Sequence, residues 1–297
     1  MLPRPSSFGI AASPPMPLSL TPVAPTADAP LSIEFDGILP DRLEGLSIDA
    51  IRRLPVLADG VPRPLADLFV VAGDGRDGLI ICDGDFSRVH RLAAGMRRGT
   101  MHVRGSVGRH AAEGMSGGTL TVDGDAGDWL AAALAGGSVR VEGNAGDNAA
   151  AALPGSRSGV SGGIVVINGA AGGLAGARMR RGVLAIGGGC GEGAAFELLA
   201  GTVIVAGRVG RRCGTGMRRG SFVALSSQPD LPPTFRRGVT WSPGFLPLLA
   251  GRLAAAGFRD TAAGHGAPSG PWSGAWQQWH GDLLAGGRGE VFHRPAA

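Results

Sequence analysis

The sequence contains no lysine and no tyrosine, so all 28 basic residues are arginine, and only 5% of the residues are aromatic. This composition reflects the coding bias of a GC-rich genome, so a single arginine carries little meaning by itself. The net charge is only +4, and arginines do not alternate with aromatic residues. Because nucleic-acid binding needs a strong positive charge and stacking side chains, we expect no nucleic acid partner.

Cysteine is scarce too. Cys82, Cys190 and Cys213 form no close pair, which argues against a disulfide framework and predicts a reducing, cytoplasmic location. We expect them to be small core residues. No stretch free of glycine, proline and charge reaches membrane-spanning length, so we expect no membrane partner.

Recognisable catalytic motifs are absent from the sequence. There is no nucleophile elbow, no phosphate-binding P-loop and no HExxH pattern, so we expect no catalytic residues. His90, His102 and His110 lie near the start of a repeated region, but none pairs with a carboxylate at ligand spacing. We therefore expect no metal site.

Glycine is in excess, with 53 residues, and it recurs with a period of 19 residues over positions 100–220. The six units start at Thr100, Thr119, Ser138, Ile164, Val183 and Thr202. Seven extra residues, 152–158, lengthen the third unit. The second and fourth residues of every unit are apolar, which predicts a short strand with one buried face. Glycines at the sixth and ninth positions predict corners with φ values that other residues avoid.

A 19-residue unit with two corners is too short for a helical hairpin or a propeller blade, and it suits one coil of a parallel β-helix. With an irregular unit at 79–99, the sequence predicts an all-β protein of about seven coils, stabilised by contacts between neighbouring coils. A calcium β-roll is excluded because it needs a nine-residue period. We therefore expect the corner carboxylates Asp125, Asp128, Asp147 and Glu192 to be solvated.

The other segments divide the rest of the chain. Residues 1–32, rich in proline and alanine, are predicted to be a flexible arm. Residues 33–78 are predicted to be a small α/β N-terminal cap on the first coil, with a helix over 40–56 and a strand at 67–72, and a further strand is predicted at 79–82, where the β-helix begins. The β-helix occupies 79–225. Residues 226–297 are predicted to be an irregular C-terminal tail with short helices, one of them over 245–258.

Two sets of apolar residues predict covered surfaces. The third strand position is polar in the first three units but is Val166, Ala185 and Ile204 in the last three, and strands with both faces apolar are covered on both faces. Either a partner subunit or the tail is expected to cover them. In the tail, Trp272 and Trp276, together with Trp279, recur at the spacing of one helical face and are expected to anchor to the repeats or to another chain.

Arginine pairs recur at one edge of the repeats. They are Arg97 and Arg98, Arg180 and Arg181, and Arg218 and Arg219. Residues at the same position of successive coils form a column, so like charges gather there. Two interpretations stand: solvated arginines on a corner, or a site for an anionic group such as an acidic patch of a partner.

The segments Gly84 to Val89 (Gly-Asp-x-Ser-Arg-Val), Gly95 to Gly99 (Gly-Met-Arg-Arg-Gly) and Val141 to Asp147, with the insertion before Gly159 to Gly163, resemble the C subunit of formylmethanofuran dehydrogenase. The resemblance covers about 39–225, and the C-terminal β-helical domain of glutamate synthase is a more distant relative. The resemblance implies a right-handed β-helix that is a non-catalytic part of a one-carbon-transfer complex.

Two complexes contain such a polypeptide: the dehydrogenase itself, and the bacterial formyltransferase/hydrolase complex, which converts formyl-tetrahydromethanopterin to formate through formylmethanofuran. The lysine-free composition favours the second. The resemblance then implies amidohydrolase-like and formyltransferase subunits as partners, and a methanofuran-type cofactor in the complex but none bound tightly by this chain. It also implies that the glutamate-rich chain of such a cofactor is a second candidate ligand for the arginine pairs. An independent β-helical enzyme is the alternative from another class.

Overall fold

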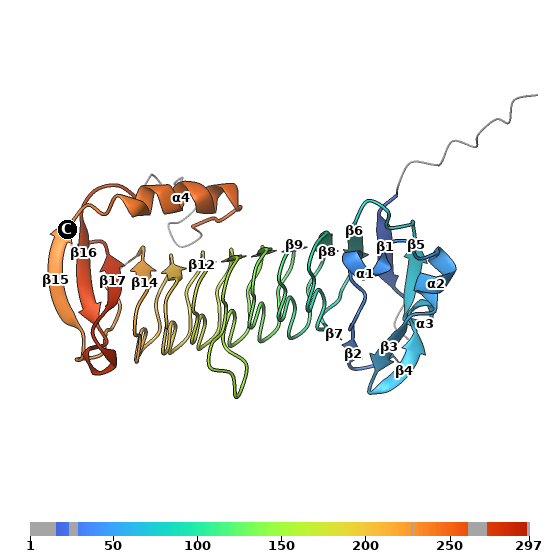
Figure 1. The fold of residues 1–297 in the computed structure, drawn as a ribbon, viewed down its shortest axis with the longest axis horizontal. Helices are drawn as coiled ribbons and strands as arrows, with labels where there is room; N and C mark the ends of the chain where they lie inside the picture. The colour runs from blue at the N-terminus through green and yellow to red at the C-terminus, as the bar shows by residue number, and fades with distance from the viewer. Residues whose placement is uncertain (1–15, 24–28, 227, 261–271, 296–297) are drawn as a thin grey trace, which may run out of the picture.

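The computed structural model describes residues 16–23, 29–226, 228–260 and 272–295. The chain is predominantly β, with one large mixed sheet, a four-stranded sheet and few helices. Its centre is a row of stacked chain turns, with the N-terminal elements at one end and the C-terminal strands at the other (Figure 1). Each 19-residue unit forms one turn of this row; we call the turns coils and the row the rod. Among the described residues, no helix is long and apolar enough to cross a membrane.

Parallel strands with the predicted register form the middle of the large sheet. They are β6 (Leu79–Asp83), β8 (Thr100–Arg104), β9 (Thr119–Val122), β10 (Ser138–Val141), β11 (Ile164–Ile167), β12 (Val183–Ile186), β13 (Thr202–Val205) and β14 (Ser221–Ala224). The first residues of successive units are direct partners, so the 19-residue alignment is confirmed. A second ladder of bridges joins the eighth positions from Val107 to Val209.

Inside the rod, the second, fourth and sixteenth positions form one apolar core. Met115, Met179 and Met217 at the sixteenth position are fully buried there, as are the strand residues Leu120 and Val203. A short coil cannot enclose such a core alone, so each coil depends on the neighbours above and below it.

The corner glycines have a different physical reason from the one predicted. No left-handed φ occurs at Gly105 or Gly172, but a Cβ atom there would lie 2.0 Å from Gly84 O and 2.1 Å from Asp147 Oδ1. The neighbouring coil comes too close for a side chain. The left-handed conformation occurs instead at the last glycine of each unit, such as Gly118 with a φ of 83°, and at non-glycine residues such as His110 and Trp129, with φ values of 61° and 62°.

The N-terminal region differs from the prediction in two ways. β1 (Leu18–Pro22) is no part of a flexible arm, because it pairs with both β5 (Phe69–Ala72) and β6 and buries Leu18 and Leu20. The expected helix over 40–56 is instead α1 (Pro40–Leu43), α2 (Ile48–Arg52) and the start of β3 (Pro55–Ala58). Gly45, at a φ of 81°, separates the helices, and Ser47 caps the second by accepting from Ala50 N.

The remaining cap elements are β2 (Ile33–Glu34), β4 (Val61–Pro64), α3 (Leu65–Leu68) and β7 (Val89–His90). The second sheet has the order β4-β3-β2-β7. Because β7 belongs to the irregular first unit, this sheet joins the cap to the rod. The rings of Phe35, Phe69 and Phe86 pack together at this junction, with centroids 5.4 to 6.5 Å apart.

The tail contains strands as well as helices. It consists of β15 (Arg236–Trp241), α4 (Phe245–Ala255), β16 (Trp276–Gly281), a 3₁₀ turn η1 (Leu283–Ala285) and β17 (Gly289–His293). α4 confirms the helix predicted over 245–258. β17 pairs in parallel with β14, and β16 and β15 follow it antiparallel, so the tail extends the large sheet past the last coil. It thereby covers the open edge of β14.

Candidate functional site

The covered strand face of the last coils lies beneath α4. Val166, Ala185 and Ile204 have no exposed surface, and they pack in one apolar cluster with Leu246 and Leu253 of the helix. Figure 1 shows α4 running along this side of the rod. Of the two candidates that the sequence leaves open, the tail is therefore the cover that the structure describes.

A polar clamp holds the end of α4. Asn168 is 1% exposed; its Nδ2 donates to Gly257 O at 3.1 Å, and its Oδ1 accepts from Arg259 N at 2.8 Å. Arg259 also pairs with Glu142, as does Arg140 at 3.1 Å. A lone asparagine directly after a strand gives no sequence signal, so this contact was not predicted.

The tryptophans of the tail are not on a helix. Trp276 and Trp279 lie in β16, and Trp272 precedes it. Trp272 and Trp276 are buried in the α4 cluster, and Trp276 Nε1 donates to Trp272 O at 3.1 Å. Trp279 packs toward the rod interior, and its Nε1 lies 3.1 Å from His293 Nε2. The two strand tryptophans thus serve different cores, because residues three apart in a strand point to opposite faces.

The predicted arginine site consists of exposed side chains on one edge of the rod. Arg180 N bonds to Val160 O, Leu199 N to Met179 O, and Arg218 N to Leu198 O. The pairs at 180–181 and 218–219 are thus two coils apart, roughly 10 Å, with Leu199 and Ala200 between them. All four side chains are exposed.

The first arginine pair lies four coils away from the pair at 180–181. Arg98 forms an ion pair with Glu44 of the cap, and Arg97 is exposed. The structure therefore brings together two of the three pairs, and the third lies at the cap.

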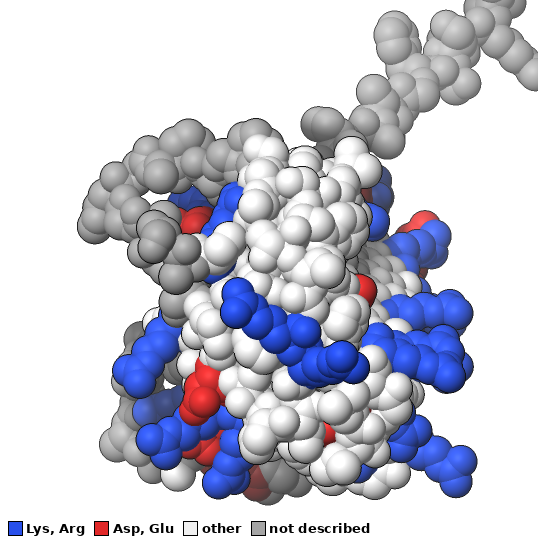
Figure 2. All heavy atoms as spheres, turned by 90° about the vertical axis from the view of Figure 1, so that its left-hand side faces the viewer, with Lys and Arg blue, Asp and Glu red and all other residues white. Residues whose placement is uncertain are grey.

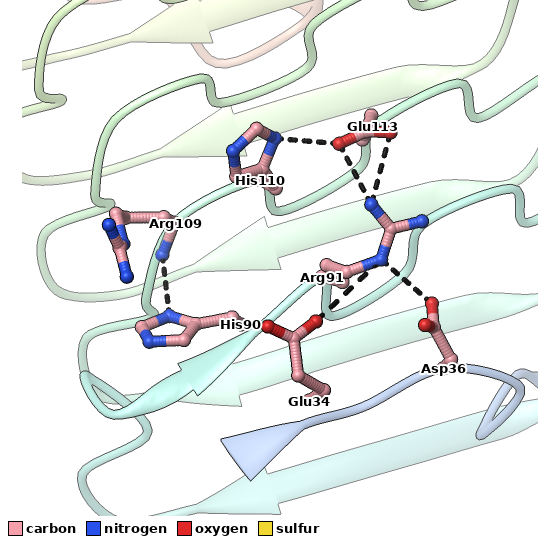
Figure 3. Close-up of polar contacts among 7 residues, drawn as sticks. All are labelled: Glu34, Asp36, His90, Arg91, Arg109, His110 and Glu113. Carbon is pink, nitrogen blue, oxygen red and sulfur yellow. Dashed lines mark hydrogen bonds and ion pairs between the residues drawn. The ribbon is translucent and has the colours of Figure 1, made fainter. Parts of the chain in front are cut away.

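Another charged cluster joins the cap to the first coils (Figure 3). Arg91 Nε donates to Asp36 Oδ1 at 2.9 Å, and its Nη1 contacts both oxygens of Glu113 at 3.1 Å. The Asp36 carboxylate is the main reason why the pKa of Arg91 is raised. His110 Nδ1 lies 2.6 Å from Glu113 Oε2, and its ring stacks on Trp129. The Arg91 guanidinium thus binds carboxylates from the cap and from the next coil, so the cluster has a structural role in holding the cap on the rod.

The side chains of three histidines of the first coils have partners that the sequence did not indicate. His110 pairs with Glu113, and His102 Nε2 lies 2.9 Å from Asp123. His90 Nδ1 accepts from Arg109 N at 3.1 Å, and burial lowers its pKa. Still, no group of three His, Cys, Asp or Glu side chains in the described residues could hold a metal ion.

Three of the four corner carboxylates, those of Asp125, Asp128 and Asp147, are not merely solvated, whereas Glu192 is exposed. Asp128 Oδ1 accepts from Asp147 N at 2.8 Å, and Asp147 Oδ1 accepts from Gly173 N at 2.7 Å. Asp125 and Asn144 make the same contact one corner earlier. Each side chain bonds a backbone N–H of the next coil, so these residues fasten neighbouring coils.

The cysteines are core residues. Burial raises the pKa of Cys82, Cys190 and Cys213, the last to about 12. A buried thiol with a raised pKa is a poor nucleophile. A cavity of about 510 Å³ lies beside β1, and the residues that line it include Asp67, Asp83 and Arg88.

None of the protein-family models matches the sequence. Among solved structures, a chain of the formyltransferase/hydrolase complex (FhcABCD) from Methylorubrum extorquens, crystallised with methylofuran, is similar to this chain with a TM-score of 0.82 and 35% identity. The similarity covers 94% of this chain and all of the other. This chain belongs to the family of formylmethanofuran dehydrogenase C subunits.

Curated members of that family show the same relationship over a shorter stretch. The C subunit of molybdenum-containing formylmethanofuran dehydrogenase 1 is 40% identical over 87 residues in both Methanothermobacter marburgensis and Methanothermobacter thermautotrophicus. These residues are 29% of this chain and 22% of those proteins. The protein of the same name from Methanosarcina barkeri is 33% identical over 84 residues, 27% of this chain and 28% of its own.

Proposed function

We propose that the chain is a non-catalytic scaffold subunit of a formyltransferase/hydrolase complex that converts formyl-tetrahydromethanopterin to formate through formylmethanofuran. The similarity over the whole length of a chain from such a complex carries this proposal. The rod has two uses in such a role. It is stiff because every coil is bonded to its neighbours, and it offers several side faces to other subunits.

The finer features of the proposal come from the family. We propose a right-handed parallel β-helix, amidohydrolase-like and formyltransferase subunits as partners, and a cytoplasmic location. A methanofuran-type cofactor belongs to the complex, which agrees with the methylofuran in the related crystal, and this chain does not bind it tightly. Membership in a formylmethanofuran dehydrogenase is the second candidate, and the curated relatives favour it.

Reconstitution of the complex tests the scaffold role. The chain is co-expressed with the other subunits, and formyl transfer and formate release are assayed with and without it. We expect no turnover by the isolated chain, and a smaller native mass and reduced flux when it is omitted. Turnover by the isolated chain, or a full-size active complex without it, would contradict the proposal. Molybdenum in the complex and formate-dependent reduction of an electron acceptor would instead indicate the dehydrogenase.

The exposed arginine column is a proposed site within this function. Replacement of Arg180, Arg181, Arg218 and Arg219 by glutamine should weaken assembly or raise the apparent KM for the cofactor, and the loss should resemble the effect of high salt. A matched variant with four lysines keeps the charge but loses bidentate contacts, so it separates charge from geometry. Unchanged assembly and salt-insensitive kinetics in the glutamine variant would leave these arginines as solvated corner residues.

A further inference from the structure

The end of the rod that β15 closes has an open strand edge. β15 is the last strand of the 13-stranded sheet and pairs only with β16 among the described residues. Five of its six residues are exposed. At a bulge in the middle of β15, Gly238 O and Val239 O accept from Gln277 Nε2 at 3.0 and 3.4 Å. The outer backbone groups on either side of the bulge remain free to pair with a further strand, a situation that proteins usually avoid or use for binding.

Large apolar side chains are exposed on both sides of the short link between this edge strand and α4. Val239 is 62% and Trp241 43% exposed on β15, and Phe245 is 38% and Leu248 77% exposed on the first turns of α4. We call these four residues the end patch. Trp241 Nε1 donates to Gln278 Oε1 at 3.1 Å, which fixes the ring before any partner arrives. Fixed, exposed tryptophans are typical anchors of protein interfaces.

The charge around the end patch is mainly positive. Between residues 236 and 252 the sequence has three arginines and no acidic residue. Arg236 and Arg252 are exposed, and neither forms an ion pair within the described residues. In the end-on view of Figure 2, blue side chains predominate over red ones on this face. An acidic partner surface is complementary to it.

We propose that β15 and the start of α4 dock an extended, acidic segment of a partner subunit, which adds to the large sheet as a strand beside β15. Backbone pairing with β15 holds the segment, apolar side chains of the partner cover the end patch, and its carboxylates meet the arginines. This proposal rests on the proposed function, because it assigns one contact of the scaffold.

Other occupants fit this surface less well. A second copy of this chain would bring the same arginines and no acid to the contact. An anionic lipid surface would satisfy the arginines but could not pair with the backbone of an edge strand. Residues 261–271 of this chain contain no large apolar side chain that could cover Leu248.

Binding of the other subunits to the full-length chain tests the proposal. The double variant Val239→Arg/Leu248→Arg should bind them at least about tenfold more weakly, and Arg236→Glu should bind more weakly with a smaller dependence on salt. Leu284→Arg is the matched control; Leu284 is 86% exposed on η1, outside the end patch, and its replacement should not change the affinity. All these positions are exposed, so the melting temperature of each isolated variant should match that of the unmodified chain.

Hydrogen exchange of the unmodified chain gives a second, mutation-free readout, since backbone amides of β15 should exchange more slowly in the complex. Unchanged affinity of the double variant, or unchanged exchange in β15, would overturn the docking edge while leaving the scaffold role intact. A homodimer of the isolated chain that the double variant dissociates, or binding to anionic vesicles that it abolishes, would assign the surface to a second copy or to lipid. Failure of the unmodified chain to assemble would overturn both proposals.

Discussion

The replacement Ile204→Lys should release α4 from the rod without unfolding the rod. Ile204 lies on the outer side of its strand, where α4 covers it completely. Its apolar cluster is separate from the core inside the rod. A lysine there either buries an unpaired charge, which costs several kcal/mol, or displaces the helix. The inner core keeps all its contacts in the second case.

The strength of the helix contact decides which outcome occurs. Leu246 and Leu253 are the residues of α4 with no exposed surface, and full burial of a leucine contributes about 1.5–3 kcal/mol. Burial of these two leucines thus holds the helix by roughly 3–6 kcal/mol, which is similar to the cost of burying the lysine charge. The entropy cost of ordering the helix reduces this holding energy further, so detachment is the less costly outcome. We therefore expect the helix to detach.

Hydrogen exchange and tryptophan fluorescence measure this release. Backbone amides of α4 should exchange faster, and the fluorescence of Trp272 and Trp276 should report a more polar environment. Thr121→Lys is the matched control, since Thr121 occupies the same third strand position in a coil that α4 does not cover. Protected α4 amides in Ile204→Lys, or equal effects of the two variants, would refute the reasoning.

Four further predictions concern the ends and corners of the rod. Truncation after Ser226 should expose the β14 edge and the outer apolar face, so light scattering should detect aggregation; a soluble, monodisperse rod would show that the tail is not a cover. Asp147→Ala should lower the unfolding free energy by about 1–3 kcal/mol, because a charge-assisted bond between coils is lost; denaturant titration measures this. Gly105→Ala should destabilise far more than Gly244→Ala in the same assay, because a Cβ atom at Gly105 meets the neighbouring backbone and one at Gly244 meets nothing within 4 Å. Burial alone would raise the pKa of Asp282, but hydrogen bonds from Gly216 N, Leu284 N and Thr234 outweigh burial and lower this pKa. The carboxylate therefore stabilises the fold above about pH 4, and this stabilisation is lost as the pH falls through the lowered pKa. The difference in unfolding free energy between the unmodified chain and Asp282→Asn should accordingly shrink in acid.

The 19-residue period in the sequence was sufficient to predict the register of the parallel strands, because every coil repeats the same local pattern and only one offset aligns all the inward residues. The apolar third positions at Val166, Ala185 and Ile204 likewise indicated a second covered face. Family membership was also recognisable, since it depends on the same repeated segments.

Tertiary structure alone decided what covers that face and how both ends close. β1 lies between β5 and β6, and Trp276 and Trp279 lie in a strand that pairs with β15. These pairings join segments more than 30 residues apart in the chain, and no local pattern indicates them. The role of Asn168 could not be predicted from the sequence either, because its partners lie at the end of α4, far along the chain. The corner glycines show the same limit: their positions follow from the sequence, but the reason for them is the backbone of the neighbouring coil, which exists only once the coils stack.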